Sequence, residues 1–208
     1  MGTISCSFII TVVLEIVIHC SYVETNEEEG SRCLKECLKS ILKFERSFTF
    51  QFENFEKICE KLESAALCNQ KCSPPNQYRF YHYTTFYRLH CIDFYEELEN
   101  QLNCLKKASP DVDKICNERC TFNNDKPSNN GNQIKIHCKT LECSLICYYK
   151  AFTSACPETS NTLLRLSTRQ IHDMRLFTRS DSPLKMETEC RQLHDENKMK
   201  QKMLEAWT

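Results

Sequence analysis

The chain has 208 residues, of which 16 are cysteine and only 3 are glycine, and it carries 27 Lys and Arg against 28 Asp and Glu. A formal charge of −1 lacks the basic surplus on which nucleic-acid binding rests, so we expect no nucleic-acid partner. The apolar content of 41% is that of an ordinary folded protein, and this many cysteines are typical of a disulfide framework in an oxidising compartment.

The three glycines, Gly2, Gly30 and Gly131, lie far apart in the chain. The dinucleotide fingerprint, the phosphate loop and the nucleophile elbow all need clustered glycines for a tight turn or a close backbone approach. The sequence therefore predicts no cofactor of these classes, and it offers no motif for any other.

An apolar run at Phe8–Ile18 has the length of a signal-peptide core and is too short to cross a bilayer. It contains Glu15 and no Lys or Arg precedes it, so a retained buried helix is the alternative. Cleavage after Cys20 would remove Cys6 and Cys20 from the 16 cysteines and leave 14, an even number as complete pairing requires. We predict a signal peptide over residues 1–20, a secreted extracellular protein and no transmembrane segment.

Helical periodicity dominates the remainder of the chain. After a polar leader over residues 21–32, apolar residues three and four apart predict helices over about 31–42, 54–72, 77–107, 109–120, 134–156, 162–178 and 183–208. The third is expected to break near Thr84-Thr85, and Ser109-Pro110-Asp111 predicts a new helix start because serine caps well and proline suits the first turn. Phe48–Phe52 alternates, but without a partner strand it is expected to be an extended connector.

These elements predict an all-α fold, a disulfide-stapled bundle of about six or seven helices with no significant sheet. The cysteine-rich domain is expected over residues 33–156, with the loop Asn123–Asn132 between two halves. Residues 157–208 are expected to form a C-terminal helical arm that is tied back by Cys190.

Eight of the cysteines form four pairs with one spacing. They are Cys33/Cys37, Cys68/Cys72, Cys116/Cys120 and Cys143/Cys147. Residues four apart lie one turn above each other on one helix face, so each pair faces a neighbouring helix rather than itself. Between antiparallel helices the bridges must cross in sequence, which predicts Cys33–Cys72 with Cys37–Cys68, and Cys116–Cys147 with Cys120–Cys143. The partners of six further cysteines stay open: Cys59, Cys91, Cys104, Cys138, Cys156 and Cys190.

Zinc binding is the competing use of repeated cysteines, and spacings of four do occur in zinc frameworks. With 14 cysteines in a predicted export product and no two-residue Cys spacing, disulfides are favoured. We therefore predict no metal site.

The order of the cysteines and an aromatic segment resemble a known family. Cys33-x3-Cys37, the run Phe48–Cys59 and Cys68-x3-Cys72, followed by Cys91, Cys104, Cys116-x3-Cys120 and Cys138-x4-Cys143-x3-Cys147, are similar to the chondroitin-proteoglycan-4 domain of nematodes. The resemblance covers roughly residues 33–156. It implies a secreted helical domain without known catalysis, carried in some cases by matrix or eggshell proteoglycans. The chain has no Ser-Gly dipeptide to which chondroitin could be attached, so the resemblance implies the domain and not the proteoglycan.

Two surfaces could bind an extracellular matrix or glycan partner. The Tyr/Arg stretch over residues 78–90 suits stacking on sugar rings and cation–π contacts; its candidates are Tyr78, Arg79, Tyr81, Tyr83, Tyr87 and Arg88. The Arg stripe over residues 165–179 could meet an anionic glycan or lipid headgroup; its candidates are Arg165, Arg169, Arg175 and Arg179. The alternatives are a helix packed on two sides for the first and a solvated face for the second.

A hydrolase of phospholipase type is the remote alternative. His194-Asp195 follows Cys190 on a predicted helix, as in secreted phospholipases, but no Gly-rich calcium loop accompanies it. We predict no catalytic residue. The sequence favours a secreted, non-enzymatic protein with an extracellular structural or binding role.

Overall fold

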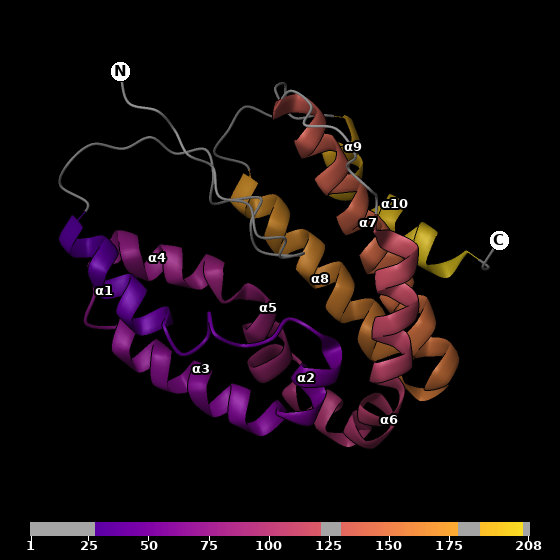
Figure 1. The fold of residues 1–208 in the computed structure, drawn as a ribbon, viewed down its shortest axis with the longest axis horizontal. Coiled ribbons are helices and arrows are strands. Elements are labelled where there is room, and N and C mark those ends of the chain that lie inside the picture. Colours follow the sequence, from indigo (N-terminus) through magenta and orange to yellow (C-terminus); the bar gives the residue numbers. More distant parts are fainter. Residues whose placement is uncertain (1–27, 122–129, 179–187, 206–208) are drawn as a thin grey trace.

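The computed structural model describes residues 28–121, 130–178 and 188–205, and within those residues it is helical with no β-strand (Figure 1). The predicted all-α class is therefore confirmed. The predicted signal peptide over residues 1–20 lies outside the described residues, as does the leader up to residue 27. The first helix begins at Glu28, three residues before its predicted start at Ser31.

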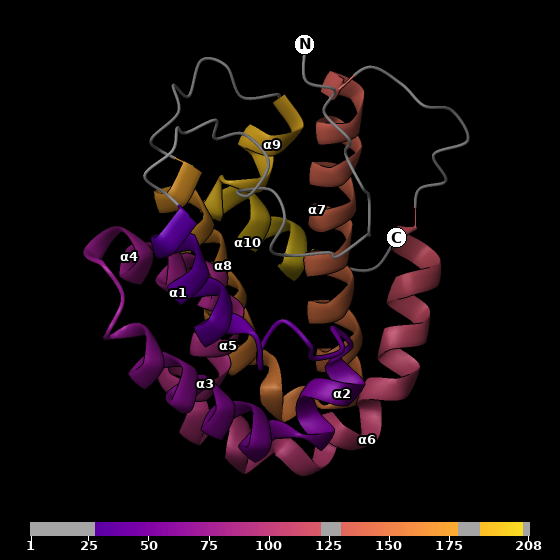
Figure 2. The same cartoon turned by 60° about the vertical axis from the view of Figure 1, so that its left-hand side comes forward.

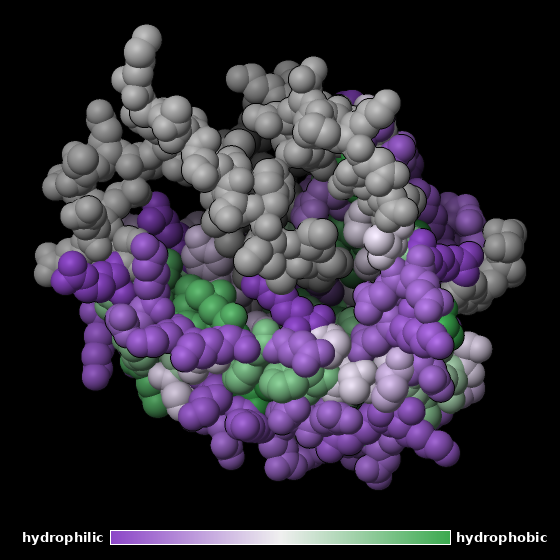
Figure 3. Space-filling view, in the orientation of Figure 1, coloured by the Kyte–Doolittle hydropathy of each residue, from purple (hydrophilic) through white to green (hydrophobic). Residues whose placement is uncertain are grey.

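The first half of the chain forms a small layer of short helices. α1 (Glu28–Leu38) packs on α3 (Phe55–Asn69) and on α4 (Pro74–Tyr83), while α2 (Phe48–Glu53) packs on α6. Their apolar faces enclose a minor core that includes Leu34, Leu38, Ile41, Ile58, Leu62, Ala65, Phe80 and Tyr87. Figure 3 shows apolar residues between α1, α4 and the linker that follows α1, framed by polar side chains.

The second half is built on two long helices. α6 (Tyr95–Cys120) and α7 (Asn130–Ala155) run side by side, as Figure 2 shows, and α8 (Ser160–Thr178), α9 (Thr188–Leu193) and α10 (Glu196–Leu204) cover α7. The main core lies between them and includes the buried residues Phe52, Leu98, Leu105, Leu141, Phe152, Ile171, Leu193 and Met199. The arm over residues 157–208 therefore shares this core in its described part.

The long helix predicted over residues 77–107 is interrupted twice. α4 ends at Tyr83 and α5 (Thr85–Arg88) begins at the predicted break, where the Thr84 hydroxyl donates to the carbonyl of Phe80 at 2.8 Å. A π-turn, η2 (Leu89–Asp93), follows α5, and α6 starts after a second break at Phe94. The extra residue of a π-turn shifts the helical register, a change that apolar periodicity alone does not reveal.

The predicted helix start at Ser109-Pro110 is wrong, because α6 continues through Pro110. A proline inside a helix leaves the carbonyl four residues earlier, here that of Lys106, without its usual donor. The Ser109 hydroxyl donates to that carbonyl at 3.1 Å and replaces the missing bond. The serine that was expected to cap a new helix instead repairs an existing one.

The predicted extended connector at Phe48–Phe52 is also wrong, since these residues form α2. The amide of Phe50 donates to the Ser47 hydroxyl at 3.1 Å, and Asp113 on α6 accepts the amides of Phe48 at 3.2 Å and Thr49 at 2.7 Å. A helix N-terminus needs partners for its first N–H groups, and these three bonds supply them. The alternating aromatic residues therefore lie on a helix, and the carboxylate of Asp113 on α6 caps the N-terminus of that helix.

The other predicted helices differ mainly at their ends. The segments predicted at residues 134–156 and 162–178 are α7 and α8, which begin at Asn130 and Ser160. The single helix predicted over residues 183–208 is two short ones, α9 and α10, because the side chain of Asp195 accepts the amide of Lys198 and starts a new helix. The predicted opening of that helix at Ser182-Pro183 and residues 123–129 of the predicted loop lie outside the described residues, while residues 130–132 of that loop belong to α7.

Candidate functional site: a disulfide framework and a charged groove

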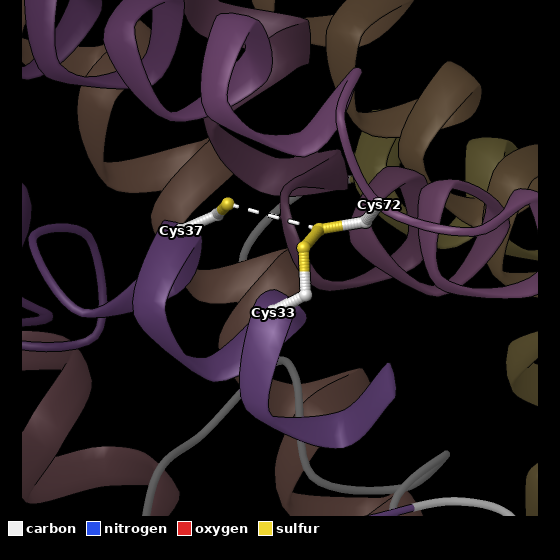
Figure 4. Close-up of side chains that lie close together, drawn as sticks. All are labelled: Cys33, Cys37 and Cys72. Carbon is white, nitrogen blue, oxygen red and sulfur yellow. Dashed lines mark hydrogen bonds between the residues drawn. A yellow bond between two sulfur atoms is a disulfide. The ribbon is translucent and has the colours of Figure 1, made fainter. Parts of the chain in front are cut away.

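Two crossed disulfides join α1 to the end of α3. Cys33 pairs with Cys72 and Cys37 with Cys68, at Cα separations of 5.9 and 5.5 Å, and these are the pairs that the spacing predicts. The two bridges touch, since Cys37 Sγ lies 3.9 Å from Cys72 Sγ (Figure 4). Two adjacent bridges along one face of α1 therefore fix this helix against the C-terminal end of α3.

A second crossed clamp joins α6 to α7. Cys116 pairs with Cys147 and Cys120 with Cys143, at Cα separations of 5.7 and 5.6 Å, again as the spacing predicts. The crossed order requires the two helices to run antiparallel. The clamp fixes the C-terminal end of α6 against the middle of α7.

Three further disulfides pair the cysteines whose partners the spacing left open. Cys59–Cys91 joins α3 to η2, Cys104–Cys156 joins α6 to the residue after α7, and Cys138–Cys190 joins α7 to α9. The last of these ties the C-terminal arm to the cysteine-rich domain through Cys190. All 14 cysteines of the described residues are thus in disulfides.

Metal-ligand atoms converge at two places in the described part of the chain. One comprises Cys33, Cys37 and Cys72, and the other Cys104, Cys156 and Glu158. Every cysteine in both groups is disulfide-bonded, and zinc coordination uses the thiolate form of cysteine. In this oxidised state neither group offers zinc a set of thiolates.

The structure divides the Tyr/Arg stretch between surface and interior. Tyr78 and Tyr81 are exposed on α4 at 61% and 43%, whereas Tyr87 and Arg88 are buried at 7% and 9%. Two other candidates, Arg79 and Tyr83, are partly buried, and Tyr83 packs against the minor core. The stretch is therefore not one continuous binding surface.

Arg88 is held in place by neighbours in its own stretch. Its guanidinium carbon lies 3.2 Å from the centre of the Tyr81 ring, and its Nη2 donates to the Thr85 hydroxyl at 3.4 Å. An arginine over an aromatic face gains a cation–π attraction, which strengthens when the pair is shielded from water. This contact serves the fold, because it orients a buried charge.

The Arg stripe is described for two of its four members. Arg165 contacts Glu97 at 3.3 Å, and Arg169 contacts Asp173 at 3.2 Å. Arg175 lies in α8 but its side chain is outside the described residues, as is the whole of Arg179. The described part of the stripe is therefore already engaged with carboxylates.

The two predicted surfaces meet at one carboxylate that the sequence analysis did not single out. Asp173 on α8 is 3% exposed; its Oδ1 contacts Arg169 and its Oδ2 lies 4.0 Å from Nη2 of Arg88. Because a buried carboxylate is costly without a cation, this acid needs both arginines. Its position four residues after Arg169 was the available signal, since residues four apart share a helix face.

A groove of about 540 Å³ opens beside this cluster, between η2, α8 and α10. Four of its lining residues can carry a positive charge: Arg165, Arg169 and His172 on α8, and Lys200 on α10. The rest of the lining comprises Asp93, Phe94, Asn161, Leu164, Thr168 and Glu196. His172 Nδ1 lies 2.9 Å from Glu196 Oε1, so α8 and α10 are joined by a hydrogen-bonded pair at the groove. Sequence reasoning missed the contribution of α10, because nothing in residues 196–200 shows that they fold against α8.

Two described histidines in the first half of the fold, His82 and His90, are suited to the neutral form. His90 is buried in η2, and its Nδ1 donates to the Phe86 carbonyl at 2.8 Å; burial lowers its pKa to about 4. Burial and then the charge of Arg88 lower the pKa of His82 to about 4. Both shifts follow from the cost of charging an imidazole away from water or near a cation.

The residues of the remote hydrolase alternative have a different role. Asp195 accepts the amide of Lys198 at 3.1 Å and contacts its ammonium at 3.9 Å, so its carboxylate caps α10. His194 and Asp195 lie at the junction of α9 and α10, not on one helix as the sequence predicts. The carboxylate is thus engaged with the backbone of α10.

Comparisons with known proteins place no further constraint on this site. No family model matches the sequence, and no curated protein and no solved structure matches the chain. Among the helices of the described residues, none combines the length and the apolar character that a bilayer span needs.

Proposed function

We propose that the protein is a secreted, disulfide-stapled helical protein that has an extracellular structural or binding role and no catalytic activity. The observation that carries the proposal is the pairing of all 14 described cysteines into seven disulfides, three within the first half of the fold and four within the second. Disulfides persist in oxidising compartments, whereas cytosolic thiols are kept reduced. The signal peptide over residues 1–20 and the resemblance to the nematode chondroitin-proteoglycan-4 domain belong to the same proposal.

The structural role is supported by how the polar groups are used. Asp113 caps α2, Asp195 caps α10, and Asp173 balances two arginines, so three acids that could serve chemistry are engaged by the fold. A general base must reach a substrate proton in a cleft, and a nucleophile must be activated by such a base. The engagement of these groups favours a scaffold over an enzyme.

A binding role is the second candidate, and the groove of about 540 Å³ favours it. Ligand sites are concave, have volumes of about 300–1,000 Å³ and place a few polar groups beside apolar lining. The groove has such a volume, but its lining is mostly polar, with Phe94 and Leu164 as the apolar members, which suits a polar ligand; it includes two members of the predicted Arg stripe, Arg165 and Arg169.

Expression in a secretory eukaryotic cell line tests the proposal. We expect the full chain in the medium, cleaved after Cys20, and peptide mapping without reduction should recover the seven disulfides. A protein that stays in the cells with reduced thiols would contradict it. Retention of the secreted protein on a glycan array, compared with binding to anionic vesicles, separates an inert scaffold from a binding module.

A further inference from the structure

We propose that the groove between η2, α8 and α10 binds a sugar unit that carries one anionic group, a carboxylate or a sulfate. The inference rests on the proposed extracellular binding role and adds to it a site and a ligand class. It is carried by the positions of the groove's cations and of the acids that hold them.

The two groove arginines are held by acids that do not line the groove. Arg165 contacts Glu97 through Nη1, and Arg169 contacts Asp173 through Nε. A guanidinium has five N–H donors, so one such contact fixes the side chain and uses only part of its capacity. Planar guanidinium donors that are already positioned suit the oxyanion of a ligand, and less side-chain freedom is lost on binding.

The apolar lining also fixes one of these arginines. The guanidinium carbon of Arg165 lies 5.2 Å from the centre of the buried Phe94 ring. Phe94 and Arg165 both line the groove, beside Leu164 of the same helix as the arginine. Leu164 is partly exposed, and apolar surface next to a fixed cation suits the C–H face of a sugar ring whose acid group meets the arginine.

The charge within the groove favours one anion rather than several. Among the lining residues, Arg165, Arg169 and Lys200 give three positive charges, against two negative charges from Asp93 and Glu196. Outside the lining, Glu97 and Asp173 each offset part of the charge of one arginine. A phosphate dianion would lie close to both carboxylates and be repelled by them. Sugar hydroxyls, in contrast, donate to carboxylates, so these acids recognise a polyol that also carries an anion.

Neutral polar side chains complete the lining. Asn161 and Thr168 lie on α8 on either side of Arg165 in sequence, and both line the groove. An amide and a hydroxyl each donate and accept hydrogen bonds, as the hydroxyls of a sugar require. The mixture of three cations, a histidine that is hydrogen-bonded to Glu196, two acids and two neutral groups is therefore accounted for by an acidic sugar more completely than by inorganic phosphate or a neutral sugar.

A matched pair of ligands tests the inference on the secreted full chain with its disulfides verified. Lactose and lactose 3′-sulfate differ only in the sulfate, and 3′-sialyllactose supplies a carboxylate instead. Binding is followed by ligand-observed NMR at 50 and 150 mM salt. We expect both acidic sugars to bind at least tenfold more tightly than lactose, with affinity that falls as salt rises.

Charge reversal on α10 locates the site. Lys200 lines the groove, whereas Lys198, two residues earlier on the same helix, is an exposed residue that contacts Asp195 and does not line it. We expect Lys200→Glu to weaken binding of lactose 3′-sulfate at least tenfold, and Lys198→Glu to change it less than twofold. Circular dichroism and a thermal unfolding midpoint within a few degrees of the parent establish that both variants are folded.

The outcomes that overturn the inference differ from those that overturn the proposed function. Equal affinity for lactose and its sulfate, no binding of either acidic sugar, equal losses in both variants, or binding only to vesicles of 30% phosphatidylserine would each overturn it. If acidic sugars bind but Lys200→Glu does not weaken them, the groove is not the site, while an extracellular binding role stands. Retention of reduced protein inside cells overturns the proposed function itself.

Discussion

The carboxylate of Asp113 on α6 accepts both the amide and the hydroxyl of Thr49 on α2, at 2.7 and 2.6 Å. The same carboxylate accepts the amide of Phe48 at 3.2 Å, so a buried acid from one half of the chain caps a helix in the other. This cap holds the Phe48 ring in the main core, 4.6 Å from the ring of Tyr148 and 5.4 Å from that of Phe152. Burial and the Asp113 charge raise the pKa of Tyr148, which keeps its phenol neutral beside this carboxylate.

Asp113→Asn should destabilise the protein for two reasons. An amide side chain has one accepting oxygen where the carboxylate has two, and it lacks the negative charge that interacts favourably with the N-terminus of α2. We expect the free energy of unfolding in urea to fall by about 1–3 kcal/mol, the range for a lost buried hydrogen bond to a charged group. Asp111→Asn is the control, since Asp111 lies exposed two residues earlier on α6. Equal losses in the two variants would show that the cap does not matter.

Asp113 also shows why part of the fold could not be predicted from sequence. Apolar periodicity and cysteine spacing are local signals, and they were sufficient for the helical class and for the four crossed bridges. The helix at Phe48–Glu53 depends on an acid 64 residues away from Thr49, and such a partner leaves no local pattern. The passage of α6 through Pro110 has a local cause in the Ser109 hydroxyl, but the same Ser-Pro pair is also a common helix start.

The pair formed by Arg88 and Asp173 predicts an asymmetric response to mutation. Asp173→Asn leaves the buried guanidinium without its acid, so we expect the free energy of unfolding to fall by about 3–5 kcal/mol. Arg169→Gln removes the other arginine that contacts Asp173. Because the Arg169 side chain is 51% exposed, water can partly replace its charge, so we expect a smaller loss than for Asp173→Asn. Chemical denaturation of both variants provides the measurement.

A double substitution distinguishes a buried ion pair from a loss of packing. Arg88→Met with Asp173→Leu removes both charges and keeps apolar volume, and such replacements are often close to neutral. The double variant should therefore be more stable than Asp173→Asn alone. If it is less stable than that single variant, packing rather than charge balance explains the effect.

The candidate site was predictable only in its separate parts. Arginines four residues apart on one helix indicated a basic stripe, and aromatic residues mixed with arginine indicated a second surface. The acids that engage Arg165 and Arg88, namely Glu97 and Asp173, come from helices whose packing depends on the tertiary fold. The groove needs α10 as well, and the turn that brings this helix back ends at the Asp195 cap.

The seven disulfides should differ in how much each contributes to the free energy of unfolding. Cys138–Cys190 closes a sequence separation of 52 and is the bridge from α7 to α9, so loop-closure entropy predicts about 4 kcal/mol for it. Cys120–Cys143 closes a separation of 23, but Cys116–Cys147 lies one turn away and constrains the same two helices. We therefore expect the double variant Cys120→Ala/Cys143→Ala to lose much less stability than Cys138→Ala/Cys190→Ala.

Hydrogen exchange followed by mass spectrometry checks this difference locally. Loss of Cys138–Cys190 should raise exchange in α9 and α10 first, because that bridge is the covalent tie of the arm to α7. Loss of Cys120–Cys143 should raise exchange only at the C-terminal end of α6 and in the middle of α7, where the clamp joins them. Similar exchange in α9 for both variants would contradict the assignment.

The buried histidine in η2 makes stability fall as the solution becomes acidic. His90 has a pKa of about 4 in the folded protein against 6.5 when exposed, so between these values the unfolded state binds a proton that the folded state does not. Stability from this group is fully present above pH 6.5, declines as pH falls towards 4 and is level below it. The difference between the two pKa values corresponds to a loss of about 3 kcal/mol over that window.

Urea unfolding of the parent and of His90→Gln at pH 7.5, 6, 5 and 4 measures this loss of stability, since glutamine keeps an N–H donor and does not titrate in that range. The parent should lose stability relative to His90→Gln on acidification, and parallel pH profiles would contradict the role assigned to His90.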